Sequence, residues 1–102
     1  MNNLIKNKYD ERVKIIKAMG HASRLFMIDE LSKGELSVCE LRDMIGDDIS
    51  TISKHLTVLK NAGLLFYDKR GSKVFYKVNI KCVSQIICCA DNVIKVQREK
   101  RA

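Results

Sequence analysis

The hydrophobic spacing of this 102-residue chain changes once, just after Gly63. Before that point apolar residues recur every three or four positions, which is typical of amphipathic helices. After it, residues 64–68 and 74–78 form two short runs rich in β-branched and aromatic side chains, with Arg70-Gly71-Ser72 between them. Two such runs around a glycine-containing turn predict a β-hairpin. The sequence therefore predicts a mainly α domain that carries one hairpin.

Residues that favour helix ends divide the helical part into segments. We expect helices over about 10–19, from a cap at Ser23 to Gly34, over about 38–45 and over about 50–62, with a last helix over about 81–97. Ser37 and Glu40 have the spacing of a capping box, and Gly46 and Gly63 suit helix ends. Two short helices, a tight turn and a following hairpin predict a winged helix-turn-helix. Residues 1–102 would form a single domain with short flexible ends at about 1–8 and 98–102.

The positive charge is concentrated in one part of the chain. The net charge is +7, yet residues 50–81 carry seven basic and one acidic side chain, whereas residues 21–49 carry three basic and seven acidic ones. Such a basic segment fits a polyanionic partner. No apolar run approaches the ~20 residues that cross a membrane, and the first residues lack the apolar core of a signal peptide. We therefore expect a cytoplasmic protein with no membrane partner.

The fourth expected helix has a polar face opposite its apolar stripe. Small hydroxyl and amide groups can contact base edges, and cations can contact phosphates. A solvated surface would explain such a face on its own, but here it coincides with the basic segment and a basic hairpin tip. The candidate DNA-binding residues are Ser50, Thr51, Ser53, Lys54, His55, Thr57 and Lys60 on the helix, and Lys69, Arg70 and Lys73 on the hairpin. For His55, which lies between the two faces, DNA contact and packing both remain open.

Several ordered motifs resemble those of the ArsR/SmtB repressors. They are Lys17–Arg24 (KAMGHASR), Glu35–Leu41 (ELSVCEL), Ser50–Leu64 (STISKHLTVLKNAGL) and the hairpin from Arg70-Gly71 to Tyr76. The resemblance implies a bacterial or archaeal winged-helix repressor that binds palindromic double-stranded operators as a homodimer and releases them when an effector binds. One departure is Ala22, where many relatives have proline. An enzyme is not expected, because the chain has no phosphate-binding loop and no glycine-rich cofactor loop.

The last expected helix has an apolar seam that a domain of this size has little left to cover. The resemblance implies a homodimer through the first and last helices, and a two-fold dimer would place two reading helices on two half-sites. The alternative is that the seam covers the domain's own core. The candidate interface residues are Val13, Ile16, Val83, Ile86, Ile87, Ala90, Val93 and Ile94.

Four cysteines could sense an effector, because thiolates bind soft ions. Family members that sense arsenic or cadmium often carry C-V-C in the third helix, and only Cys39 of that pair is present in Ser37-Val38-Cys39. Adjacent Cys88 and Cys89 could supply two ligands to As(III) or Sb(III), with a third sulfur from Cys82 or a partner chain. DNA binding itself would need no cofactor. The last helix has no histidine, which disfavours the zinc or nickel site of some relatives, and we interpret His21 as local structure.

Three alternatives accompany this interpretation. Peroxide or reactive sulfur species could oxidise the same thiols, which would make the protein a redox-sensing repressor. The cysteines could instead be small buried side chains without a sensing role. In a different class, the basic face could bind an acidic protein partner without any sequence-specific DNA binding.

Overall fold

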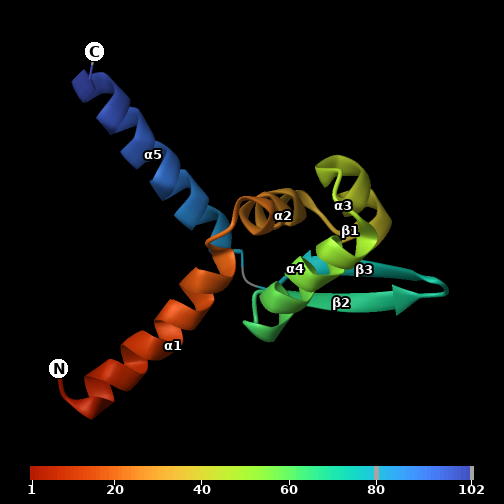
Figure 1. The fold of residues 1–102 in the computed structure, drawn as a ribbon, viewed down its shortest axis with the longest axis horizontal. Coiled ribbons are helices and arrows are strands. Elements are labelled where there is room, and N and C mark those ends of the chain that lie inside the picture. The colour runs from red at the N-terminus through yellow and green to blue at the C-terminus, as the bar shows by residue number, and fades with distance from the viewer. Residues whose placement is uncertain (80, 102) are drawn as a thin grey trace.

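The computed structural model describes residues 1–79 and 81–101, and its elements follow the predicted order of four helices, a hairpin and a last helix. The helices are α1 (Asn3–Met19), α2 (Ala22–Lys33), α3 (Val38–Ile45), α4 (Ile49–Asn61) and α5 (Val83–Arg101), and the strands are β1 (Leu36–Ser37), β2 (Leu65–Arg70) and β3 (Lys73–Val78). Helices α1 and α5 extend from one side of a body formed by α2–α4 and the sheet (Figure 1). Helices α3 and α4 with the β2–β3 wing form the expected winged helix-turn-helix.

The predicted ends of α3 and α4 are confirmed in atomic detail. The Ser37 hydroxyl accepts a hydrogen bond from the Glu40 amide, and the Glu40 carboxylate accepts one from the Ser37 amide, both at 3.1 Å. Gly46 and Gly63 have φ angles of 91° and 84°. Since this left-handed region is open to glycine at little cost, both glycines end their helices where the sequence indicates.

Other predicted boundaries are wrong. Helix α1 begins at Asn3 rather than near residue 10, because the Asn2 side chain caps the amide of Ile5 at 3.0 Å. Residues 3–8 and 98–101, expected as flexible ends, are therefore helical, and Ala102 lies outside the described residues. Helix α2 is capped by His21, whose Nδ1 accepts a hydrogen bond from the Ser23 amide at 3.1 Å, and not by Ser23 itself.

The core holds one face of α4 and leaves the other exposed. Ile52, Leu56 and Leu59 of α4 are fully buried against Met27 and Ile28 of α2. The three-stranded antiparallel sheet has the order β1-β3-β2, and its first strand, β1, pairs Leu36 with Tyr76. The sequence did not predict β1, because two residues are too few to show an alternating pattern. This packing fixes the wing and α4 in one body.

Candidate nucleic-acid interface

Helix α4 begins at a well-formed cap that orients its first turn. The Asp48 carboxylate accepts hydrogen bonds from the Thr51 amide at 2.8 Å and from the Ser50 hydroxyl at 3.1 Å. These bonds lower the pKa of Asp48, and the bond from the Thr51 amide has the largest effect. The carboxylate therefore stays charged at the positive end of the helix dipole. Ser50 and Thr51 are therefore held at the start of the exposed face.

The polar face predicted for α4 is present in the structure. Ser50, Ser53, Lys54 and Thr57 are exposed, and Thr51 is partly buried. The Thr57 hydroxyl donates to the carbonyl of Ser53 at 2.9 Å, which leaves its oxygen free to accept. A face of short hydroxyls with one long cation allows close approach to the floor of a major groove.

Two of the predicted DNA-binding residues of α4 contact other parts of the chain. The His55 ring is partly buried, with its centroid 4.4 Å from that of His21. Burial, and then the nearby charges of His21 and Arg24, lower the pKa of His55. The Lys60 ammonium group lies 5.2 Å from the centre of the Tyr67 ring in β2. Both side chains lie at boundaries of the polar face rather than at its centre.

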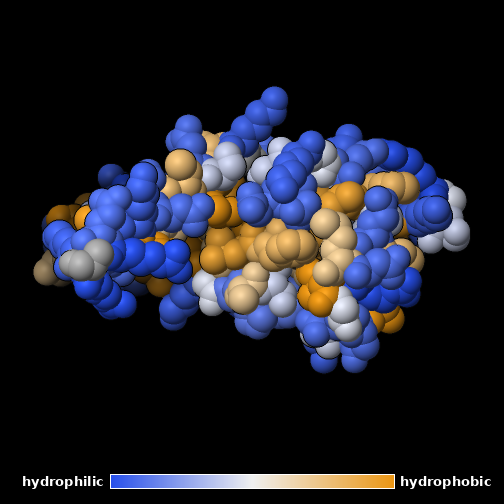
Figure 2. All heavy atoms as spheres, turned by 90° about the horizontal axis from the view of Figure 1, so that it is seen from above, coloured by the Kyte–Doolittle hydropathy of each residue, from blue (hydrophilic) through white to orange (hydrophobic). Residues whose placement is uncertain are grey.

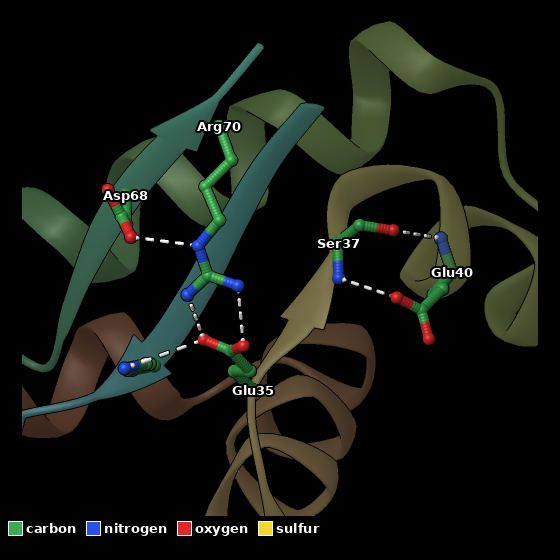
Figure 3. Close-up of polar contacts among 6 residues, drawn as sticks. Glu35, Ser37, Glu40, Asp68 and Arg70 are labelled. Atoms are coloured by element: carbon green, nitrogen blue, oxygen red, sulfur yellow. Dashed lines mark hydrogen bonds and ion pairs between the residues drawn. The ribbon is translucent and has the colours of Figure 1, made fainter. Parts of the chain in front are cut away.

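The wing tip carries two exposed lysines and one engaged arginine. Lys69 and Lys73 are exposed, and neither forms an ion pair within residues 1–79 and 81–101. The Arg70 guanidinium instead binds both carboxylate oxygens of Glu35, at 2.8 and 2.7 Å, and Asp68 at 3.0 Å (Figure 3). Sequence reasoning missed Glu35 because nothing local links residue 35 to residue 70, and it missed Asp68 although that residue lies only two positions before Arg70.

A hollow of about 280 Å³ separates the wing tip from the helix-turn-helix. It is lined by residues from the first turns of α3 and α4 and from the wing, among them Cys39, Ser53 and Lys73. The polar face of α4 and the basic tip of the wing therefore border one concave surface. A duplex lying across this side of the molecule could contact both.

The cysteines are all accessible in the single chain. Cys39, Cys82, Cys88 and Cys89 are exposed, so the alternative that they are small buried side chains is wrong for one protomer. Helix α5, which carries Cys88 and Cys89, and helix α3, which carries Cys39, lie on opposite sides of α2 (Figure 1). Within the described residues no three cysteine, histidine or acidic side chains come together as a metal site. A complete soft-metal site therefore does not form within one described chain.

The predicted interface residues on α1 and α5 are mostly exposed. Val13, Ile16, Ile86, Val93 and Ile94 are between 42% and 60% exposed, and Ala90 is also exposed. Val83 is buried in the chain's own core, and Ile87 packs partly against that core. The prediction of Val83 as an interface residue is therefore wrong, and the core alternative holds at the start of α5.

Apolar side chains also gather between α2 and α5, a feature that sequence reasoning missed. Leu25, Phe26, Ile87, Ala90 and Ile94 line a hollow of about 250 Å³ there, together with the acidic Asp29 and Asp91. Figure 2 shows an apolar area in the middle of this face of the molecule with hydrophilic side chains on both sides. Phe26 is 37% exposed in the single chain. The uncovered apolar surface thus extends from α5 onto α2.

Comparisons with known proteins match this geometry. Residues 21–67, which span α2 to the first half of β2, match the family model described as "Bacterial regulatory protein, arsR family". A cadmium resistance transcriptional regulatory protein CadC homolog of Staphylococcus aureus is 34% identical over 86 residues, which are 83% of this chain and 71% of the relative. The chain belongs to the ArsR family. It is therefore a DNA-binding transcriptional regulator and not an enzyme.

Two further comparisons cover most of the chain. The arsenical resistance operon repressor of Staphylococcus aureus is 34% identical over 79 residues, covering 78% of this chain and 76% of the relative. The homodimeric winged helix-turn-helix DNA-binding domain Mb0332 of Mycobacterium bovis superposes with a TM-score of 0.81 at 23% identity, covering 98% of this chain and 93% of that one. This second likeness confirms the fold. Within residues 1–79 and 81–101, no helix is long and apolar enough to span a bilayer.

Proposed function

We propose that this ArsR-family chain is a homodimeric repressor that binds a palindromic double-stranded operator through α4 and the β2–β3 wing. The observation that carries the proposal is the shared hollow, bordered by Ser53 of α4 and Lys73 of the wing. Because both elements face one surface, a single duplex would meet hydroxyl groups in its groove and cations along its backbone. Residues 1–102 would act as one domain that both binds DNA and dimerises.

We propose that the predicted DNA-binding residues fall into two groups, those that contact DNA and those that support the contacting surface. Ser50, Thr51, Ser53, Lys54 and Thr57 would face the groove, and Lys69 and Lys73 would neutralise phosphates. His55, Lys60 and Arg70 would support the surface through His21, Tyr67 and Glu35. This division modifies the sequence interpretation, in which all ten residues are candidates for DNA contact and packing is left open for His55 alone.

The DNA-binding proposal is tested with duplexes taken from upstream of the protein's own gene. Footprinting should show protection of two half-sites by the wild-type chain. In fluorescence anisotropy, Lys69→Ala should weaken binding to every sequence and reduce the salt slope by about 0.9 for each phosphate that the variant no longer neutralises. Lys95→Ala on α5 is the matched control, since it removes a lysine that is also exposed but remote from the wing. If the salt slope falls equally in both variants, DNA affinity depends on the net charge of the protein and not on the position of Lys69.

The footprint also decides between repressor and protein-interaction module. A module that uses its basic face on an acidic protein would bind duplexes weakly and without positional protection. Protection of a defined pair of half-sites would exclude that alternative.

We propose that As(III) or Sb(III) binds Cys88 and Cys89 and releases the operator. The support is that two adjacent, exposed thiols lie on α5, the helix that also carries exposed apolar side chains of the proposed interface. Because one described chain offers no third ligand nearby, the third sulfur would come from Cys82 after a local shift, or from the partner chain. Binding would then change how the two protomers sit, and by linkage DNA would weaken As(III) binding to the same extent.

The effector proposal has a direct test. Cys88→Ser/Cys89→Ser should bind the operator normally and keep it when As(III) is added, whereas Cys39→Ser, the control, should release it as wild type does. If the double variant still responds to As(III), the site on α5 is wrong. If peroxide rather than As(III) releases the wild-type operator, and mass spectrometry shows oxidised sulfur, the redox alternative replaces metalloid binding.

A further inference from the structure

Four charged side chains form a chain of ion pairs across the sheet, from Asp68 through Arg70 and Glu35 to Lys77. Arg70 binds Glu35 through two parallel hydrogen bonds of 2.8 and 2.7 Å and binds Asp68 at 3.0 Å, and the Lys77 ammonium lies 3.5 Å from Glu35 (Figure 3). Bidentate arginine–carboxylate pairs fix direction as well as distance. The four formal charges cancel, so this network adds little to the attraction for DNA.

The Arg70–Glu35 contact spans the whole width of the sheet. Arg70 belongs to β2, Glu35 immediately precedes β1, and β3 lies between them in the order β1-β3-β2. Between the two strands the guanidinium lies over the Phe75 ring of β3, with its Cζ atom 4.5 Å from the ring centre. Arg70 thus connects the outer strand of the wing to the segment on the far side of β3.

The segment that receives Arg70 also begins the helix-turn-helix. After Glu35, Leu36 and Ser37 pair with Tyr76 and Phe75 of β3. Ser37 is at the same time the N-cap of α3, through the two hydrogen bonds of the capping box. Three consecutive residues, Glu35, Leu36 and Ser37, therefore contact β2, β3 and α3 between them. A shift of the wing relative to the helix-turn-helix would have to break at least one of these contacts.

We infer that Glu35 is a positioning residue for DNA binding: it holds Arg70, and through Arg70 the angle of the wing, so that Lys69 and Lys73 meet the phosphates while α4 lies in the groove. Arg70 itself then contacts no phosphate. This inference rests on the proposed DNA-binding function and deepens it. It gives Arg70 and Glu35 the role of positioning the wing, rather than that of attracting or repelling the DNA by their charge.

A different role for Glu35 predicts the opposite change in DNA affinity when its charge is removed. If phosphates compete with Glu35 for Arg70, the carboxylate is inhibitory, and removing its charge should tighten DNA binding. If Glu35 positions the wing, Glu35→Gln should weaken binding even though it makes the surface more positive. The pair is exposed, so the expected loss is roughly two- to fivefold, the upper range for a surface ion pair.

The experiment measures operator affinity of the full chain against salt concentration by anisotropy. Glu35→Gln and Arg70→Gln should each weaken binding with an unchanged salt slope, and the double variant should be no weaker than either single one. Arg70→Lys should lose about as much as Arg70→Gln, because lysine keeps the charge but cannot form the bidentate pair. Asp43→Asn, an exposed acid on α3, is the matched control and should not weaken binding. Tighter binding by Glu35→Gln, or a lower slope for Arg70→Gln, overturns the inference.

A second measurement separates failure of this inference from failure of the proposed function. In the DNA-free protein, Glu35→Gln should speed amide hydrogen exchange in β2 and β3 but not in α1. If the wild-type chain protects no operator, the DNA-binding proposal fails while this result still decides whether Glu35 holds the wing. Unchanged exchange in β2 and β3 would show that it does not.

Discussion

His55 shows how a residue on the edge of a functional face can serve packing. Its ring lies against His21, and burial is the main reason that its pKa is lowered from the ordinary value of 6.5. The groups that face it are His21 and Arg24 from the start of α2 and Asp47 from the turn before α4. Of these, only Asp47 favours the charged imidazole. Burial therefore disfavours the charged form of His55 in the folded state.

The lowered pKa predicts a loss of stability in mild acid. The unfolded chain takes up the His55 proton near pH 6.5, whereas the folded chain resists it to lower pH. The His55 contribution is therefore complete above about pH 6.5 and is lost as the pH falls from there through the folded pKa. Thermal unfolding between about pH 8 and pH 5.5 should show a smaller decrease in Tm for His55→Gln than for wild type. Parallel curves for the two proteins would contradict this assignment.

Ser37 offers a second test at the scale of one residue. It is 5% exposed and provides both halves of the capping box with Glu40. Ser37→Ala should lower the free energy of unfolding by about 1 kcal/mol, as measured by urea denaturation. Ser32→Ala is the control, since that hydroxyl only donates back to the carbonyl of Ile28 within α2 and such bonds add little to a helix. Equal losses in the two variants would argue against a special role for the cap.

At the scale of the element, helix ends with local chemistry could be predicted and those set by distant contacts could not. The capping box at Ser37 and the glycines at 46 and 63 act within a few residues, so the sequence was sufficient to place α3 and α4. The start of α1 was missed although Ile5 and Tyr9 continue the apolar spacing that leads to Val13, because these first two turns are exposed and depend on a local cap at Asn2 rather than on the core. The link from Arg70 to Glu35 was missed because the two residues are 35 positions apart.

Gly63 tests whether the end of α4 depends on backbone conformation. Its φ angle is 84°, and a Cβ atom at this position would meet nothing within 4 Å. Gly63→Ala should therefore cost about 1–2 kcal/mol through the left-handed backbone alone. Gly34→Ala, after α2, is a matched control because that site is equally open but has an extended φ of 160°. Urea denaturation should show a clear loss for the first variant and a small change for the second.

At the scale of the whole molecule, one chain is more extended than a domain of its length usually is. Its radius of gyration is 15.8 Å, whereas a chain of this length is expected to have about 13 Å. The difference comes from α1 and α5, which extend away from the body (Figure 1). Both helices carry exposed apolar side chains, and the hollow between α2 and α5 adds more. A second copy packed on these helices would restore a usual ratio of surface to volume.

The proposed dimer predicts that one charge on α5 should separate the protomers. Val93 is 53% exposed beside Ile94 and Ala90, and burying an unpaired carboxylate there would be costly. Val93→Glu should sediment as a monomer at concentrations where wild type is a dimer. Asn92→Glu adds the same charge on the side of the helix away from Ala90 and Ile94, because residues two positions apart lie about 200° apart around the axis, and it should remain dimeric. Because a dimer binds both half-sites at once, Val93→Glu should also lose footprint protection of the paired sites while its far-ultraviolet spectrum stays helical. A dimeric Val93→Glu would move the interface away from this face of α5.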